Sequence, residues 1–350
     1  MKYKFDILTS TGIFSFTQGL KKQFCIFISL IAAMQVLAQD PQMTQFYAAP
    51  QYLNPAFTGL TTEHRFVANY RNQWPGIRKT YQTSMAAYDY NLSNVNSGIG
   101  IFAMQDVAGT AGLKHSQAGL NYAYRFTVRK VSEIRAGISV SYNMKSLGFS
   151  KLTFNDQLVT GSSTSLDGTT YGQRSFVDIG AGVLFNSTKY WIGGAVKHLN
   201  RPNVSLIGGQ EPLPMFIGLH GGYRYIIEQK GKTALKRFVS VAFNYKHELK
   251  NDQFDVGFYY FHAPVNFGFW YRGIPFKNYA PGYVNNESFA LLIGFEVPKR
   301  NLRIGYSYDM TLSQLGINNT TGSHEVSLIY EYAQRKKRKA KHVLVTCPKF

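Results

Sequence analysis

The sequence predicts an all-β protein, a transmembrane antiparallel β-barrel of about 14 strands, on three observations. Only 16% of its 350 residues are charged and 15% are aromatic, whereas soluble domains carry ~25% charged residues. Segments of roughly ten residues alternate between apolar side chains and polar or small ones, which is the signature of a barrel strand. Past the amino-terminal segment, the chain has no apolar run of the ~20 residues that a spanning helix needs.

The alternation is clearest over residues 132–146. The apolar face of this segment comprises Ile134, Ala136, Ile138, Val140, Tyr142 and Met144, and the opposite face comprises Arg135, Gly137, Ser139, Ser141, Asn143 and Lys145. A helix repeats every 3.6 residues and cannot place these two sets on separate faces. We therefore expect a strand with one face toward lipid and the other toward the lumen.

Fourteen segments follow this pattern, although some ends are less distinct. They are 63–73, 79–91, 97–106, 112–127, 132–146, 174–187, 188–199, 214–227, 237–248, 252–262, 263–272, 287–297, 300–312 and 322–333. An even number places both ends of the barrel in the periplasm. The connections expected outside the cell are then 74–78, 107–111, 147–173, 200–213, 249–251, 273–286 and 313–321, which include the longest ones. A soluble β-sandwich would also alternate, but with more charge on its outer faces.

The amino-terminal residues 1–38 are typical of a secretory signal peptide. Lys21 and Lys22 precede an apolar stretch from Phe24 to Met34, and small Ala38 marks the expected cleavage site. A membrane anchor is the alternative, but about 11 residues at 1.5 Å each are too short to span the bilayer. Cleavage would leave Cys347 as a single thiol, which cannot form an intramolecular disulfide.

Two terminal segments lie outside the predicted barrel of residues 63–333. Residues 39–62 are rich in Pro, Gln and aromatics and lack alternation, so we expect a periplasmic leader, either flexible, docked on the rim or inserted in the lumen as a plug. Residues 334–350 form a basic periplasmic tail with six cations between Arg335 and Lys341. Such a run is either simply solvated or attracts an acidic partner or peptidoglycan.

The sequence predicts no catalytic, cofactor-binding or metal site. HExxH, GxSxG, Walker A and CxxC motifs are all missing, and the eight His are scattered. Polar residues on the expected lumen face are Arg71, Arg125, Arg135, Asp178, Lys197, Arg224, Arg272, Arg303 and Asp309. They either line a pore or pair with one another inside a filled barrel, and strand number does not decide between these arrangements.

Several stretches, in order along the mature chain, resemble one known family. They are QDPQ (39–42), QFY (45–47), YLNPA (52–56), YRNQWPG (70–76), HLNRP (198–202), LP (213–214), LH (219–220), GYR (222–224), WYRG (270–273), IGYSYD (304–309), TL (311–312), GSHE (322–325) and the closing CPKF (347–350). On these stretches the chain is identified as similar to the PorP/SprF membrane proteins of type IX secretion systems.

The resemblance implies an outer-membrane protein of a Gram-negative bacterium that serves secretion rather than catalysis. Its expected role is to bind, deliver or anchor secreted or gliding-adhesin cargo at the cell surface, and the alternative is a passive or solute-selective channel. The expected partners are periplasmic type IX secretion machinery, cargo with a C-terminal sorting domain and outer-membrane lipid, but no nucleic acid. Outer loops 147–173, 200–213 and 273–286 are expected to hold cargo. The residues expected to bind partners are Trp74, Arg201, Tyr271, Arg272, Arg335, Lys336, Lys337 and Arg338.

Overall fold

The computed structural model describes most of the chain from residue 40 to residue 333. The described residues are 40–77, 81–109, 112–129, 132–148, 153, 155–163, 165, 172–206, 208–230, 234–249, 251–280, 283–297, 300–313 and 315–333. The signal peptide and the basic tail predicted from the sequence therefore lie outside the described residues. No described helix is both long and apolar enough to cross a membrane.

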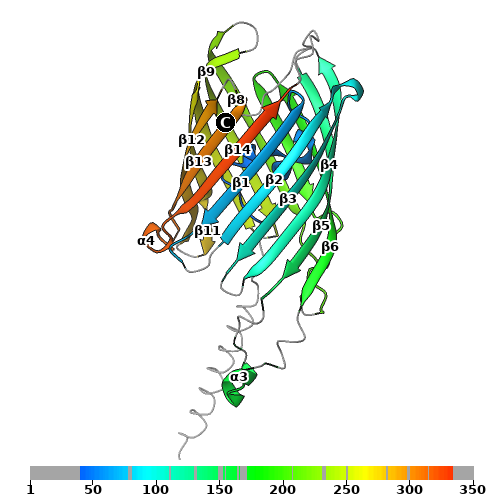
Figure 1. The fold of residues 1–350 in the computed structure, drawn as a ribbon. Helices are drawn as coiled ribbons and strands as arrows, with labels where there is room; N and C mark the ends of the chain where they lie inside the picture. Colours follow the sequence, from blue (N-terminus) through cyan, green and yellow to red (C-terminus); the bar gives the residue numbers. More distant parts are fainter. Residues whose placement is uncertain are drawn as a thin grey trace, which may run out of the picture. The chain divides into compact units, whose positions relative to one another are not determined.

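Fourteen antiparallel strands form one closed barrel (Figure 1). They are β1 (His64–Gln73), β2 (Tyr81–Leu92), β3 (Ser97–Ala108), β4 (Leu113–Arg129), β5 (Ser132–Ser146), β6 (Gln173–Ser187), β7 (Tyr190–Lys197), β8 (Phe216–Lys230), β9 (Ala234–Glu248), β10 (Asn251–His262), β11 (Val265–Ala280), β12 (Tyr283–Val297), β13 (Leu302–Thr311) and β14 (Ser323–Tyr332). Each strand pairs with the next, and β14 pairs with β1 in a register running from His64↔Tyr332 to Gln73↔Ser323. The predicted fold class is confirmed.

The barrel is polar inside and apolar outside. Leu120 on β4 and Ile192 on β7 point outward and are 65% and 57% exposed, whereas Arg71 on β1 and Asp89 on β2 point inward and are 2% and 0% exposed. Hydrocarbon accepts such an outer face, and closure satisfies the backbone groups that an open sheet edge would leave unpaired. The arrangement is that of a membrane barrel and not of a soluble sandwich.

Two predicted connections are wrong in length. The expected outer loop 273–286 is mostly strand, because β11 continues to Ala280 and β12 begins at Tyr283. The ladder between β11 and β12 continues past Gly273 through three register shifts, and such bulges disturb the alternation on which the prediction rested. The expected turn 228–236 is shortened in the same way, since β8 ends at Lys230 and β9 begins at Ala234.

The two ends of the barrel differ in the length of their connections. Connections after even-numbered strands are short, the longest being 93–96 and 298–301. Connections after odd-numbered strands include 147–172, which contains α3 (Asn155–Thr160), and 312–322, which contains α4 (Ile317–Thr320). Figure 1 shows α4 at the end of the barrel opposite to the end where β9 begins. Long loops face the cell exterior, so we name the α4 end the outward rim and the other end the periplasmic rim.

Candidate functional site: the filled lumen

Residues 41–62, here named the plug, lie inside the barrel. The plug contains three short helical turns, η1 (Phe46–Ala48), α2 (Pro50–Leu53) and η2 (Pro55–Phe57). Nearly all of its residues from Met43 to Thr61 are buried. Its polar and aromatic contacts reach strands all round the barrel, from β1 to β14. Because these turns are too short to be stable alone, the barrel wall determines the shape of the plug.

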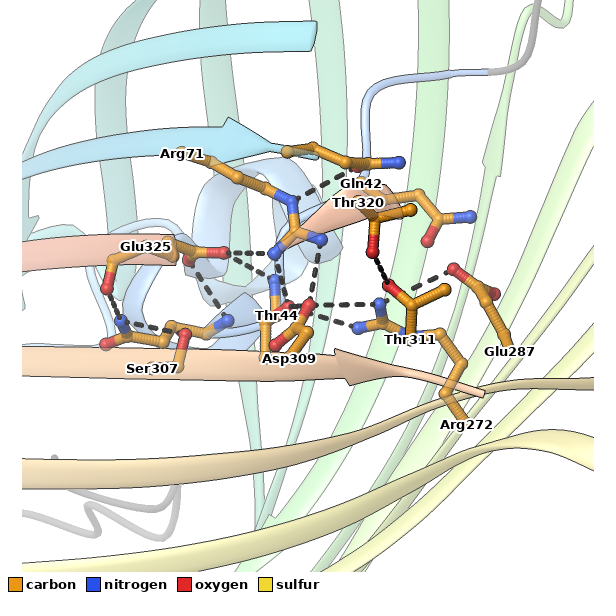
Figure 2. Close-up of polar contacts among 12 residues, drawn as sticks. Gln42, Thr44, Arg71, Arg272, Glu287, Ser307, Asp309, Thr311, Thr320 and Glu325 are labelled. Carbon is orange, nitrogen blue, oxygen red and sulfur yellow. Dashed lines mark hydrogen bonds and ion pairs between the residues drawn. The ribbon is translucent and has the colours of Figure 1, made fainter. Parts of the chain in front are cut away.

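At the outward end, the plug is bound through Thr44, which Figure 2 shows, and through Gln45. The backbone N–H of Thr44 donates to Glu325 Oε2 at 2.6 Å, and that of Gln45 donates to Oε1 at 3.0 Å. The Thr44 hydroxyl donates to Asp309 Oδ2, also at 2.6 Å. Arg71 pairs with both carboxylates, at 2.8 Å from Asp309 and 3.3 Å from Glu325.

A second guanidinium completes this group. Arg272 Nη2 donates to the Thr44 hydroxyl at 3.2 Å, and Arg272 lies 3.4 Å from Asp309 and 3.4 Å from Asp255. We name Thr44, Arg71, Arg272, Asp309 and Glu325 the outward cluster. All five are buried, and buried charges of this kind are tolerated only when paired and hydrogen-bonded.

In the middle of the lumen, Asn54 binds the opposite wall. Its side-chain amide donates to the carbonyl oxygens of Val183 and Gly194 at 3.2 and 3.1 Å, and it lies 3.1 Å from His220 Nε2. Its Oδ1 atom accepts from the backbone N–H of Ala56 at 2.9 Å and so caps η2. One asparagine thus fixes both the local turn and its position in the barrel.

Arg135 on β5 holds the following turn of the plug. Its guanidinium donates to the backbone oxygens of Ala56 at 3.0 Å and Thr58 at 2.6 Å. These carbonyls end a short helix and have no helical partner. A cation is therefore well placed to satisfy them.

At the periplasmic end, Arg65 and Asp89 form a buried ion pair with an Nε–Oδ1 distance of 2.8 Å. Asp89 also accepts from the backbone N–H of Gly59 at 2.7 Å, and Arg65 donates to the Phe57 carbonyl at 3.2 Å. The Thr61 hydroxyl donates to Glu331 on β14 at 3.2 Å. The plug therefore joins β1 from the periplasmic rim.

Aromatic rings fill the space between these polar contacts. The ring centroid of Phe46 lies 4.8 Å from that of Trp270, and Tyr47 lies 5.9 Å from Trp191 and 6.4 Å from Tyr259, all with edge-to-face geometry. Such pairs add about 0.5–1.5 kcal/mol each beyond area burial. The plug is thus bound by packing as well as by charge.

The wall is shaped to the plug by glycines, here named the wall glycines. A Cβ atom added at any of them would approach a plug atom within 2.7 Å, and they are Gly98, Gly100, Gly137, Gly182 and Gly305. At Gly137, for example, the added Cβ would lie 2.4 Å from the backbone nitrogen of Ala56. Glycine is the residue that permits such close backbone approach. Strands β3, β5, β6 and β13 therefore carry the glycines that make room for the plug.

The chain path corrects one expectation about the leader. Asp309 and Glu325 lie within two residues of the outward ends of β13 and β14, and Gln42 binds Gln253 near the outward start of β10. Residues 42–45 therefore lie in the outward part of the lumen. The beginning of the leader is therefore not docked on the periplasmic rim. Only the last part of the plug, which leads into β1, reaches that rim.

The lumen charges singled out from the sequence contact other residues inside the barrel. Arg303 lies 3.0 Å from Glu331, and the imidazole of His198 lies 3.0 Å from the Asp178 carboxylate. Lys197 stacks on the ring of Tyr52 in the plug, with Nζ 3.5 Å from the centroid. The sequence left two arrangements open, a pore lined by these charges and a filled barrel in which they are paired. The contacts agree with the filled barrel.

Four of the residues expected to bind partners lie at or near the outward rim. Arg201 is exposed in the 198–215 connection, Trp74 and Tyr271 are half-buried, and Arg272 is buried in the outward cluster. Arg272 therefore faces internal carboxylates and not a surface. The other four, Arg335, Lys336, Lys337 and Arg338, lie outside the described residues.

The stretch around Trp74 docks one outward loop on another. Trp74 adopts a φ of 59°, and its N–H donates to the Gly322 carbonyl at 3.0 Å. The Gly76 N–H donates to the Thr320 carbonyl at 3.1 Å, and a Cβ at Gly76 would lie 2.5 Å from the Asn319 carbonyl oxygen. The β1–β2 loop is thereby held against the loop that contains α4.

Asn200 closes a strand edge beside Arg201. Its side chain accepts from the Ile179 N–H at 3.1 Å and donates to the Val177 carbonyl at 2.7 Å, both on β6. Strand β7 stops short of this part of β6. Asn200 therefore covers backbone groups that an open edge would expose.

Comparison with known proteins agrees with this architecture. The sequence model of one protein family, the type IX secretion system membrane protein PorP/SprF, matches residues 36–330 of this chain. The chain belongs to the PorP/SprF family. It is therefore a type IX secretion system membrane protein, and its closed barrel with an apolar outer face places it in the outer membrane.

Solved structures with similar folds are outer-membrane barrels of low identity. Omp33 of Acinetobacter baumannii is 8% identical with a TM-score of 0.42, and the match covers 79% of this chain and all of that one. The toluene transporter TodX of P. putida is 10% identical with a TM-score of 0.45, covering 81% and 93%. The monoaromatic hydrocarbon channel CymD is 12% identical with a TM-score of 0.44, covering 83% and 94%. No curated protein matches the chain.

The contacts between the family-like stretches were not foreseen from the sequence. Gln45, Asn54, Arg71, Asp309 and Glu325 each lie in a stretch that resembles the family, and all of them take part in binding the plug. The clearest signal in the sequence is the set of lumen-facing glycines, because a barrel interior without Cβ atoms at those positions leaves room for another segment.

Proposed function

We propose that this PorP/SprF protein binds and anchors exported cargo at the outer face of the membrane and does not conduct solutes. The observation that carries the proposal is the plug, which crosses the lumen and at both ends is hydrogen-bonded to carboxylates that take part in buried ion pairs of the wall. A barrel filled in this way offers partners its rims and loops. Cargo with a C-terminal sorting domain is the partner that the family resemblance implies.

Exposed apolar side chains on α3 and in the outward part of β11 support this assignment. Leu158 and Val159 on α3 are 71% and 86% exposed, and Phe276 in the extended β11–β12 hairpin is 98% exposed. An exposed apolar patch outside the lipid-facing band is typical of a protein-association site. We assign these three residues, together with exposed Arg201, to the cargo-binding surface.

Co-purification of exported proteins with the tagged full-length chain tests the proposal. Phe276→Ser should reduce recovered cargo by roughly tenfold, the effect of losing a well-packed interface anchor. Val95→Ser is the matched control, because Val95 is also exposed but lies in the periplasmic β2–β3 turn. Equal recovery from both variants, or no exported protein with the parent chain, contradicts the proposal.

The proposed role involves no reaction at a catalytic residue. Among the described residues, no group of three or more His, Cys, Asp and Glu side chains is arranged to hold a metal ion. The lumen carboxylates and guanidiniums described above bind one another and the plug. A channel, the alternative function, would require the plug to leave the lumen.

Contact with periplasmic secretion machinery is proposed for the basic tail. Deleting residues 335–350 removes seven Lys and Arg side chains and should leave the barrel folded, because β14 ends at Tyr332. Recovery of periplasmic components with the tagged chain should fall most at low salt, where exposed charges are least screened. Unchanged recovery and unchanged secretion contradict a role for the tail.

A further inference from the structure

The outer face of the barrel carries a groove of about 460 Å³ over strands β2–β5. Its floor is a row of alanines on three neighbouring strands, in which Ala86 lies opposite Ala103 and Ala103 lies opposite Ala118. The row nearer the outward rim is also mostly small and consists of Ser84, Gln105 and Ser116. Both rows belong to the lipid-facing side of the sheet.

Large side chains enclose this groove. On the periplasmic side, Tyr88, Ile101 and Leu120 form the next row of the same face. On the β5 side, Tyr142 pairs with Ala118 and Met144 pairs with Ser116. Ile101, Leu120 and Tyr142 project from the wall, since they are 53%, 65% and 57% exposed. The hollow is therefore two rows high, about 13 Å along the strands.

A cation stands at the outward edge of the groove. Lys114 is exposed and lies one row above Ser116 on the same face. Its cross-strand neighbours, Val107 and Ser146, carry no charge. From the periplasmic side to the outward side, the groove is thus apolar at the alanine row, polar at Ser84, Gln105 and Ser116, and positive at Lys114.

We propose that this groove binds a phosphate-bearing lipid of the outer leaflet, with one acyl chain over the alanine row and the phosphate beside Lys114. A hollow on the lipid-facing side of a barrel is filled either by a lipid or by a neighbouring protein. The order of apolar floor, polar row and cation matches the order of tail, linkage and phosphate in such a lipid. A partner's transmembrane strand would present apolar side chains along its full height and would leave the polar row and Lys114 unmatched.

Native mass spectrometry of the full-length barrel with added diphosphoryl lipid A tests the proposal. The parent protein should retain one lipid A molecule in preference to phosphatidylcholine. Ala103→Trp fills the floor and should abolish this retained adduct, and Lys114→Gln should weaken it about fivefold, the contribution of one cation near an anionic lipid surface. Ala136→Trp is the matched control, on the lipid face of β5 outside the groove.

Folding of each variant is checked by the heat-dependent shift of the barrel on electrophoresis. Should Ala103→Trp fail to fold, Ala86→Leu narrows the same floor with a smaller side chain. Retention of lipid A that is equal in the Lys114→Gln, floor and control variants overturns the proposal. Cross-linking of the Ala103→Cys variant to a partner polypeptide in cells also overturns the proposal, because protein and not lipid then covers the groove.

Discussion

The Glu325 carboxylate on β14 accepts the backbone N–H of Thr44 at 2.6 Å, although the two residues are 281 positions apart in the chain. The same carboxylate accepts the next backbone N–H, and Arg71 lies beside it. A single wall residue thus binds the outward end of the plug through backbone N–H groups, which every residue except proline would supply at those plug positions.

Glu325→Gln should loosen the plug. The substitution removes the charge that faces Arg71 and replaces one acceptor oxygen with a donor, so one plug N–H loses its partner. We expect unfolding in urea to require about 1–3 kcal/mol less free energy, with an earlier shift in fluorescence of Trp191 and Trp270, which contact the plug. Glu211→Gln, in an exposed loop, is the control. An unfolding midpoint equal to that of the control contradicts this role of Glu325.

Gly137→Ala should strain the contact between the wall and the plug backbone at Ala56. The new Cβ would lie 2.4 Å from the Ala56 nitrogen, so the plug backbone must shift, at a cost of about 1–3 kcal/mol. At Gly294, by contrast, a new Cβ meets its nearest neighbour at 3.5 Å, an ordinary contact. Thermal unfolding of the two variants measures the difference, and equal transition temperatures would argue against close contact at Gly137.

Gln42→Cys tests the direction of the plug. Because Gln42 binds Gln253 close to the outward rim, a thiol there should react with a membrane-impermeant maleimide on intact cells. The variant is made with Cys347→Ser, and Lys189→Cys in the periplasmic β6–β7 turn is the control. Labelling of position 189 but not of position 42 on intact cells would reverse the assigned orientation.

The strands could be predicted because each rests on a local, period-2 pattern. In β5, the apolar and polar sets assigned from the sequence occupy opposite faces of the wall, with Ile138 outside and Arg135 inside. The ends of strands were less predictable where the pairing of two strands continues beyond the segment of alternating side chains. Beyond Gly273, backbone hydrogen bonds and bulges extend β11 to Ala280, and these depend on pairing and not on hydrophobicity.

The position of the plug could not be deduced, because its contacts join residues far apart in sequence without any period. Asn54 meets Gly194 at a separation of 140 residues, and Gln45 meets Glu325 at 280. In the sequence, Glu325 and Asp309 are only polar members of alternating strands. What distinguishes them is the partner that folding brings to them.

The most direct test of the filled-lumen account is the conductance of the full-length chain in a planar lipid bilayer, compared with a variant lacking residues 42–58. Both proteins are first shown to be folded by the heat-dependent electrophoretic shift. We expect the full-length protein to be electrically closed and the variant to conduct, because the deletion removes the segment that binds Glu325 through Thr44 and the Gly194 carbonyl through Asn54. Stable conductance of the full-length chain at the level of the variant would contradict the account and favour a channel.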